Sequence, residues 1–118
     1  MSKLQWKGSP LLAPVPAALV SCGTLEKPNA LTIAWTGITC SDPPMTYISV
    51  RPERYSYDII KESGEFVINL TSGAMARATD FCGVRSGREM DKLAATGLTV
   101  EPAKEIAAPV IAQSPLAL

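Results

Sequence analysis

Two groups of polar side chains bracket one short stretch of the chain, residues 38–60, "ITCSDPPMTYISVRPERYSYDII". The second group, within residues 51–57, contains arginines, a serine and tyrosines where a helix is expected to begin. A helix start offers free N–H groups and a favourable dipole to a phosphate, and arginine binds phosphate with two parallel hydrogen bonds. The alternative is a surface strand end followed by an ordinary helix cap. The candidates for an anion site are Arg51, Arg54, Ser56 and Tyr57.

The first group, at residues 39–41, consists of small and hydroxyl-bearing side chains. Similar side chains continue upstream of it as far as Asn29. In the expected strand at 30–38, Thr32, Ala34 and Thr36 share one face. Small residues let a flat ring approach the backbone, and hydroxyls and N–H groups can bond ring carbonyls and nitrogens. The alternative is that threonine simply favours strands. The candidates of this group are Asn29, Thr32, Thr36, Thr39, Cys40 and Ser41.

A third cluster of cations lies in "CGVRSGREMDK", residues 82–92. Arg85, Arg88 and Lys92 surround the start of an expected helix, which makes this a further anion-binding candidate. Because Asp and Glu residues interleave with them, a solvated, salt-bridged face is the alternative. The glycines do not match the phosphate-loop motif, which ends in Gly-Lys-Ser/Thr.

Composition excludes several other kinds of chemistry. The chain has no histidine, which removes Ser-His-Asp catalysis, Cys-His catalysis and histidine-ligated zinc. The three cysteines are far apart and form no Cys-x-x-Cys pair, which favours reduced thiols in a cytoplasmic protein. Eleven basic residues balance eleven acidic ones, so nothing indicates attraction to nucleic acid or to an anionic membrane. No apolar run is long enough for a transmembrane helix.

The elements that must position these residues follow from patterning. Strands are expected at 17–23, 30–38, 45–51 and 65–70, the first two as an antiparallel hairpin, with shorter ones at 98–100 and 108–112. Pro14 and Pro16 indicate an extended lead-in before the first strand.

Three helices are expected between and after these strands. The first begins at an N-cap, Ser56, and ends at Gly64. The second spans 74–82 and is closed by Gly83. The third begins at a capping box formed by Ser86 and Glu89, runs to about residue 95 with Gly97 ending it, and buries Met90, Leu93 and Ala94.

Three strands in succession through short connections favour an antiparallel sheet or barrel with helices packed at its ends, rather than regular βαβ units. At 118 residues, of which 47% are hydrophobic and 19% charged, the chain predicts one domain, 1–118, with a packed core. The strands leave open sheet edges, which proteins normally cover. We therefore expect either a fold that is incomplete at its C-terminus or a partner that completes the sheet.

The order of residues across 29–70 resembles the flavin reductase-like family of FMN-binding split barrels, particularly its flavoredoxin-like branch. The resembling features include the strand ending Ala34-Trp35, the turn 41–44, the helix start 55–57 and the Gly64-Glu65-Phe66 run. The segment "CGVRSGREMDKLAATGL" (82–98) resembles the same branch. The resemblance implies a mainly β, antiparallel Greek-key split barrel with short helices, shortened at the C-terminus relative to the family, and a homodimer with FMN near its interface.

By position, the resemblance assigns two groups of residues to the flavin. Those expected beside the ring are Asn29, Thr32, Ala34, Trp35, Thr36, Thr39, Cys40 and Ser41. Those expected toward the ribityl phosphate are Arg51, Arg54, Ser56, Tyr57 and Lys92. No side-chain acid or base and no metal is expected to be essential, because the flavin carries the chemistry.

Three functions are therefore compatible with the sequence. The first is an FMN-binding oxidoreductase that passes electrons from NADH or NADPH through the flavin to an acceptor. The second is a shortened, non-catalytic relative that binds flavin weakly or assembles by completing its sheet with another copy. The third is a binding protein for a different phosphorylated ligand at the same helix start.

Overall fold

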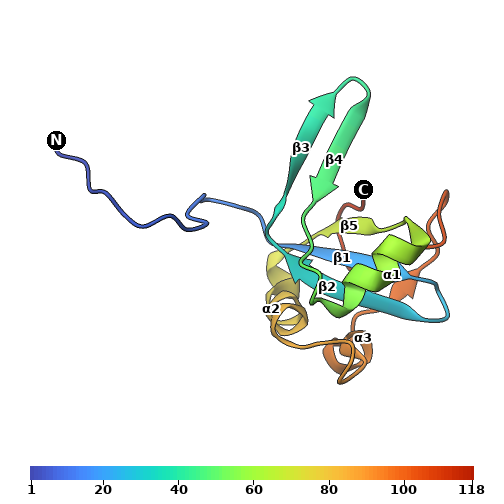
Figure 1. Ribbon diagram of the computed structural model, residues 1–118. Coiled ribbons are helices and arrows are strands. Elements are labelled where there is room, and N and C mark those ends of the chain that lie inside the picture. The colour runs from blue at the N-terminus through green and yellow to red at the C-terminus, as the bar shows by residue number, and fades with distance from the viewer.

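The computed structural model describes residues 1–118, and residues 1–17 run as an extended lead-in outside the folded body (Figure 1). Three strands form the central sheet in the order β2-β1-β5: β1 (Ala18–Gly23), β2 (Pro28–Ile33) and β5 (Val67–Leu70). Both neighbours are antiparallel to β1, so Val20 lies opposite Leu31 on one side and Ile68 on the other. The predicted β1–β2 hairpin is confirmed.

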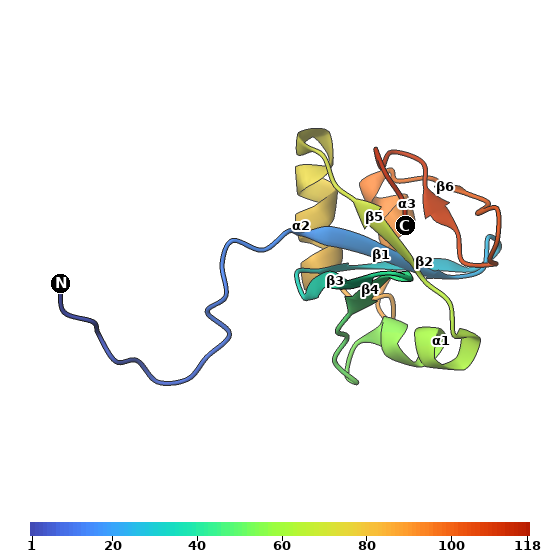
Figure 2. The same ribbon diagram turned by 90° about the horizontal axis from the view of Figure 1, so that it is seen from above.

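Helices cover the two faces of this sheet (Figure 2). One face packs against α1 (Tyr55–Ser63) and carries an apolar cluster that includes Val20, Leu31 and Ile68. The other carries a cluster that includes Leu19 and Ala30 and packs against the helices that follow β5. Because side chains alternate along a strand, β1 contributes to both clusters and is buried along almost its whole length.

A projecting hairpin follows β2. β3 (Thr36–Ser41) pairs only with β4 (Pro44–Ile48) and extends away from the central sheet (Figure 1). The prediction of one strand over 30–38 is wrong, because the chain bends at 34–35 and changes sheets. The expected strand at 45–51 starts one residue earlier and ends at Ile48, although Ser49 N still donates to Trp35 O at 2.9 Å.

The helix starts differ from the predicted ones. Arg54, not Ser56, is the N-cap residue of α1, and Ser56 lies buried in its first turn. Gly64 ends α1 with φ 70°, as expected of a left-handed terminating residue. The second helix is preceded by a 3-10 turn, η1 (Gly73–Met75), and α2 (Ala76–Val84) passes through Gly83, so the predicted stop at that glycine is wrong.

The expected capping box at Ser86 and Glu89 is also wrong. Ser86 Oγ accepts a hydrogen bond from Arg88 N at 3.2 Å within a turn, and the helix α3 (Lys92–Thr96) starts only after its N-cap, Asp91. Leu93 is buried as expected, whereas Met90 and Ala94 are exposed. Lys92 takes an interior position instead, with 4% of its surface exposed.

The C-terminal part of the chain adds two short strands, β6 (Val100–Glu101) and β7 (Val110–Ile111), which pair with each other. Residues 116–118 then run beside β5: Ile68 N donates to Leu118 O at 2.9 Å, and Leu70 N donates to Leu116 O at 2.9 Å. The outer edge of β5 is therefore covered within the chain. The sheets are small and form no closed barrel.

Neither of the two longest helices approaches membrane-spanning length. α1 and α2 have 9 residues each, against about 20 apolar residues required to cross a bilayer, and no helix of the structure qualifies as a span.

Candidate functional site

Arg54 lies at the junction of two neighbouring cavities. The strand cavity, about 300 Å³, is lined by residues 31–35 of β2 and the bend after it, by residues 49–51, and by Arg54. The helix-start cavity, about 190 Å³, is lined by Leu31, residues 53–56, residues 84–89 and Lys92. Arg54 Nη1 donates to Gly83 O at 3.3 Å, which holds the guanidinium against the last turn of α2. The two cavities therefore share Leu31 and Arg54 as a common wall.

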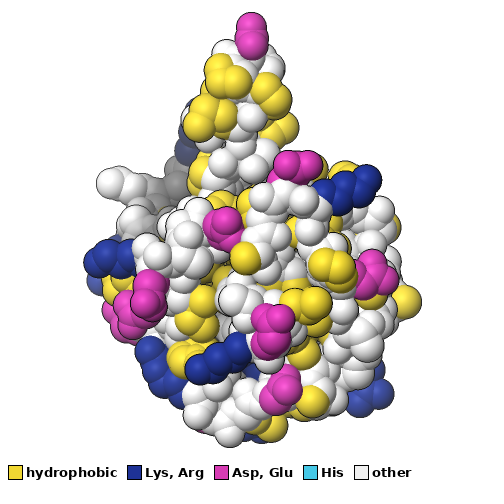
Figure 3. Space-filling view, turned by 90° about the vertical axis from the view of Figure 1, so that its right-hand side faces the viewer, with side chains coloured by type: hydrophobic (Ala, Val, Ile, Leu, Met, Phe, Trp, Pro, Cys, Tyr) yellow, Lys and Arg dark blue, Asp and Glu magenta, His cyan; other side chains and the backbone are white.

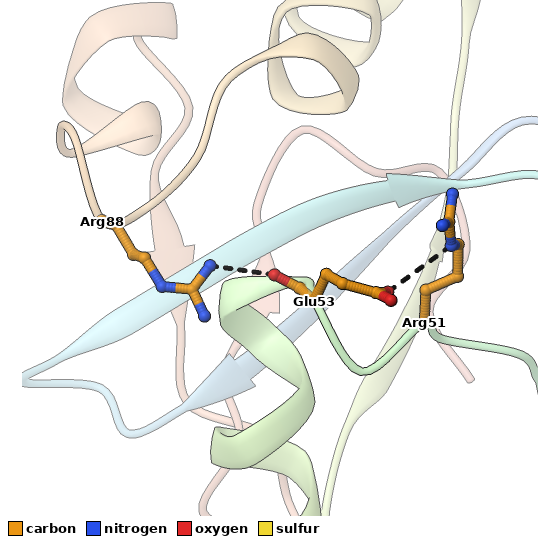
Figure 4. A network of polar contacts seen from close by, with 3 residues as sticks. All are labelled: Arg51, Glu53 and Arg88. Carbon is orange, nitrogen blue, oxygen red and sulfur yellow. Dashed lines mark hydrogen bonds and ion pairs between the residues drawn. The ribbon is translucent and has the colours of Figure 1, made fainter.

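Cations gather around the helix-start cavity. Arg54, Arg85 and Arg88 contribute to its wall, together with Glu53 and Glu89. Arg88 Nη1 donates to Glu53 O at 2.9 Å (Figure 4). The Arg88 guanidinium also lies 5.6 Å from the centre of the Tyr55 ring. Both contacts draw the 84–89 segment against the start of α1.

The start of α1 adds uncapped backbone to this cavity. No side chain caps the helix, so the N–H groups of its first turn have no side-chain acceptor. With the helix dipole, they favour an anion at this end. The exposed ion pair between Arg51 Nε and Glu53 Oε2, 3.5 Å apart, lies beside it and contributes little by itself (Figure 4).

A buried polar layer supports the cavity from beneath. Asn29 Nδ2 donates to Ser56 Oγ at 2.6 Å, and Lys92 Nζ donates to Cys82 O at 3.2 Å. Burial is the main reason that the pKa of the Cys22 thiol is raised; hydrogen bonds with Ser56 and Asn29 act against that shift. Burial also raises the pKa of Cys82. The two thiols are therefore neutral near pH 7.

Gly87 allows the 84–89 segment to reach this layer. A Cβ placed at Gly87 would overlap the Tyr55 ring and lie 2.5 Å from Asn29 Oδ1. Only a residue without a side chain fits between these two groups, so Gly87 sets how closely the cationic segment approaches α1.

The structure brings some of the sequence-predicted residues together. Thr32, Ala34, Trp35, Arg51 and Arg54 line the strand cavity. Ser56 and Lys92 line the helix-start cavity with Arg54, and Asn29 is hydrogen-bonded to Ser56.

Other predicted residues lie elsewhere. Thr39, Cys40 and Ser41 lie on the part of β3 nearest the tip of the projecting hairpin and line neither cavity. Thr36, at the base of the hairpin, donates to Tyr47 O at 2.8 Å. Tyr57 borders a separate apolar groove together with Lys61. The Lys61 ammonium lies 5.8 Å from the centre of the Tyr57 ring.

The 84–89 segment is the part of the cavity wall that the sequence did not assign. Its cations were recognised as an anion-binding candidate, but not as belonging to the same site as Arg54. The Ser-Gly-Arg run at 86–88 is the signal for it, since a glycine between a hydroxyl and a cation suits close backbone approach.

Comparisons with known proteins agree with this architecture. The family model described as "Flavin reductase like domain" matches residues 12–118. An uncharacterized protein of Pyrococcus abyssi is 30% identical over 108 residues, covering 92% of this chain and 62% of that protein.

Solved structures give the same result. The flavoredoxin of Desulfovibrio vulgaris (Miyazaki F) superposes with a TM-score of 0.90 at 37% identity, over 98% of this chain and 64% of the flavoredoxin. The flavoredoxin from Methanosarcina acetivorans gives a TM-score of 0.90 at 27% identity, over 100% of this chain and 62% of that chain. The chain thus spans less than two thirds of the length of each relative. On the family-model match over residues 12–118, the chain belongs to the flavin reductase like domain family.

Proposed function

We propose that this chain binds FMN and passes electrons from NADH or NADPH through the flavin to an acceptor. The observation that carries the proposal is the pair of adjoining cavities that meet at Arg54. One is lined by a strand and is partly apolar, and the other is lined by cations and a helix start. A flavin mononucleotide has the same two parts, a flat ring system and a phosphate.

The residues present suit FMN at each part. Leu31, Ile33 and Trp35 offer apolar surface to the ring, and Thr32 and Ala34 keep the neighbouring wall small. The phosphate would lie among Arg54, Arg88 and the first N–H groups of α1, which would donate hydrogen bonds to it. Hydrogen bonds to a charged group are stronger than those between neutral groups. When bound, FMN would supply the hydride-accepting and electron-donating chemistry. The chain's own residues bind it, orient it and provide the electrostatic surroundings.

Replacing Arg54 by methionine tests the phosphate side. Arg54 is exposed, so we expect the loss of its charge to raise the dissociation constant for FMN by about tenfold, equivalent to one charge-assisted hydrogen bond. Fluorescence quenching of FMN on titration with protein measures this. Arg77→Met, at an exposed cation on α2, is the matched control and should leave the affinity unchanged.

Two results would contradict the proposal in different ways. A colourless protein that does not quench FMN fluorescence would refute flavin binding. A protein that binds FMN but oxidises neither NADH nor NADPH with an acceptor present would be the non-catalytic relative instead.

The proposal includes a homodimer assembled through the β3–β4 hairpin. Ile38, Met45 and Tyr47 on this hairpin are 80%, 52% and 49% exposed, and Figure 3 shows hydrophobic side chains over the projecting arm. Such an apolar arm is typical of a surface that a second protein covers.

Ile38→Asp tests the dimer. A charge in a buried apolar contact is costly, so we expect the dimer dissociation constant in sedimentation equilibrium to rise more than tenfold. Leu25→Asp, at a leucine in the β1–β2 turn that is 42% exposed, is the control and should remain dimeric. If the unmodified protein is monomeric at all concentrations, the dimer proposal is wrong.

A further inference from the structure

Lys92 is a buried cation without a counter-charge. The residue is 4% exposed, and the single hydrogen bond of its side chain within the protein is from Nζ to Cys82 O. An ammonium carries three donors, so two of them have no partner in the chain. The only ion pair of the structure joins Arg51 to Glu53, so no carboxylate lies within ion-pair distance of Lys92.

The groups around Lys92 supply no ion-pair partner. The neutral thiols of Cys82 and Cys22 lie near it on α2 and β1, and the Arg54 guanidinium faces it from the start of α1. Its own N-cap, Asp91, uses Oδ1 to accept from Ala94 N. The remaining charged groups on the wall of the helix-start cavity are Glu53, Arg85, Arg88 and Glu89, and Lys92 also borders a further cavity lined by Glu26 and Lys27.

Burial is the main reason that the pKa of Lys92 is lowered from its ordinary value of 10.5; the Cys82 thiol opposes this, and Arg54 adds to it. A phosphate in the helix-start cavity would reverse the balance, because an adjacent dianion favours the ammonium over the amine. Lys92 lines that cavity together with Arg54 and Ser56.

We propose that Lys92 couples the binding of a phosphorylated ligand to proton uptake, giving up its proton more readily when the cavity is empty and retaining it when a phosphate supplies the missing counter-charge. The inference rests on the proposed function for the identity of the ligand, FMN, but its physical basis is the unpaired ammonium. It makes Lys92 the residue through which pH controls preference for phosphorylated over unphosphorylated flavin.

The sign of the pH effect follows from linkage. Between the pKa of Lys92 in the free protein and its higher pKa in the complex, binding takes up a proton, so FMN affinity falls as pH rises. A phosphate monoester is already a dianion above pH of about 7, because its second pKa is about 6. Both thiols have a raised pKa, since burial shifts them above 9.0. Riboflavin has the same ring without the phosphate, so ionisation of the ring cancels in the comparison.

The experiment measures FMN and riboflavin affinities of the unmodified protein from pH 7 to pH 10. We expect the FMN-to-riboflavin affinity ratio to fall with a slope of up to about tenfold per pH unit within the window, as for one linked proton. Calorimetry at the pH where this ratio falls most steeply, in two buffers of different ionisation enthalpy, should show proton uptake with FMN and none with riboflavin. Equal pH dependence of the two ligands, or no proton uptake, would overturn the inference.

Lys92→Met separates this role from simple packing. We expect the variant to lose the pH slope of the affinity ratio, to bind FMN about tenfold less tightly at pH 7, and to keep an unchanged or higher melting temperature without ligand, because an uncompensated buried charge has been removed. Lys92→Arg stays charged and should retain FMN affinity at pH 10. Lys104→Met, at an exposed lysine in the β6–β7 loop, is the control. A slope that persists in Lys92→Met would refute the assignment.

Inorganic phosphate distinguishes failure of this inference from failure of the proposed function. If FMN does not bind but phosphate raises the melting temperature in a pH-dependent way that Lys92→Met abolishes, the flavin function is wrong and the Lys92 coupling stands. If FMN binds without linked proton uptake, the coupling is wrong and the flavin function stands. If neither ligand binds, both are wrong.

Discussion

Replacing Asn69 by alanine is expected to destabilise the fold by several kcal/mol, about 3–5 kcal/mol in the free energy of unfolding. The side chain is fully buried in β5, where Nδ2 donates to Leu19 O at 3.0 Å and to Ser21 Oγ at 2.9 Å. Its Oδ1 accepts from Ile111 N at 2.9 Å. One amide therefore joins β1, β5 and β7.

Alanine leaves the buried Ile111 N–H without its acceptor and removes the bonds to Leu19 O and Ser21 Oγ, although Ser21 still donates to Pro109 O. An unsatisfied buried group costs about 1–3 kcal/mol and each further lost hydrogen bond about 0.5–1.5 kcal/mol, so we expect a loss of about 3–5 kcal/mol in the free energy of unfolding. Urea denaturation measures it as a lower midpoint with an unchanged slope. Thr71→Val is the control: it removes one hydrogen bond, from Thr71 Oγ1 to Ala17 O, at an exposed site, and should cost under about 1 kcal/mol. A loss below 1 kcal/mol for Asn69→Ala would contradict the assigned role.

Replacing Gly87 by alanine is expected to damage both stability and ligand binding. The added methyl group would overlap the Tyr55 ring and press on Asn29 Oδ1, which belongs to the side chain that bonds Ser56. Overpacking of this kind costs typically about 1–3 kcal/mol, and we expect about 2–3 kcal/mol here because both neighbours are held in place.

The same change should displace the cationic segment from the start of α1. We therefore expect FMN affinity to fall more than tenfold, measured by fluorescence quenching on samples whose fold is verified by circular dichroism. Gly73→Ala offers a matched control, because a Cβ at Gly73 meets no atom within 4 Å. It should alter neither stability nor affinity. Unchanged FMN binding in Gly87→Ala would show that the approach of the 84–89 segment is irrelevant to the site.

Local sequence signals located the central strands well. β1 and β5 carry runs of apolar and β-branched residues, and their positions follow from that pattern within two residues, whereas the strand expected over 30–38 ran past the end of β2 at Ile33. Gly64 and Gly97 end their helices with φ 70° and 73°, as predicted from the position of each glycine after an expected helix. These features depend on the conformational preferences of a few adjacent residues, so one sequence is enough to specify them.

Helix starts were predicted less well, because several polar residues compete to cap one end. Ser86 with Glu89 has the spacing of a capping box, yet Asp91 caps α3 and Ser86 forms a turn. Ser56 has a good cap side chain, yet tertiary packing buries it against Asn29. The decisive contacts come from residues distant in sequence, which a local pattern does not contain.

The sequence by itself determined the residue types of the candidate site: hydroxyls and small residues in one strand, and arginines around a helix start. Tertiary structure alone decided which of them meet. The bend at 34–35 carries Thr39, Cys40 and Ser41 out along the hairpin, while Gly87 brings Arg88 against Tyr55. Tertiary structure also buried Lys92 beside two neutral thiols and the Arg54 guanidinium, with no carboxylate within ion-pair distance. The physical reason is that side-chain chemistry is fixed residue by residue, whereas burial and proximity depend on how separate elements pack.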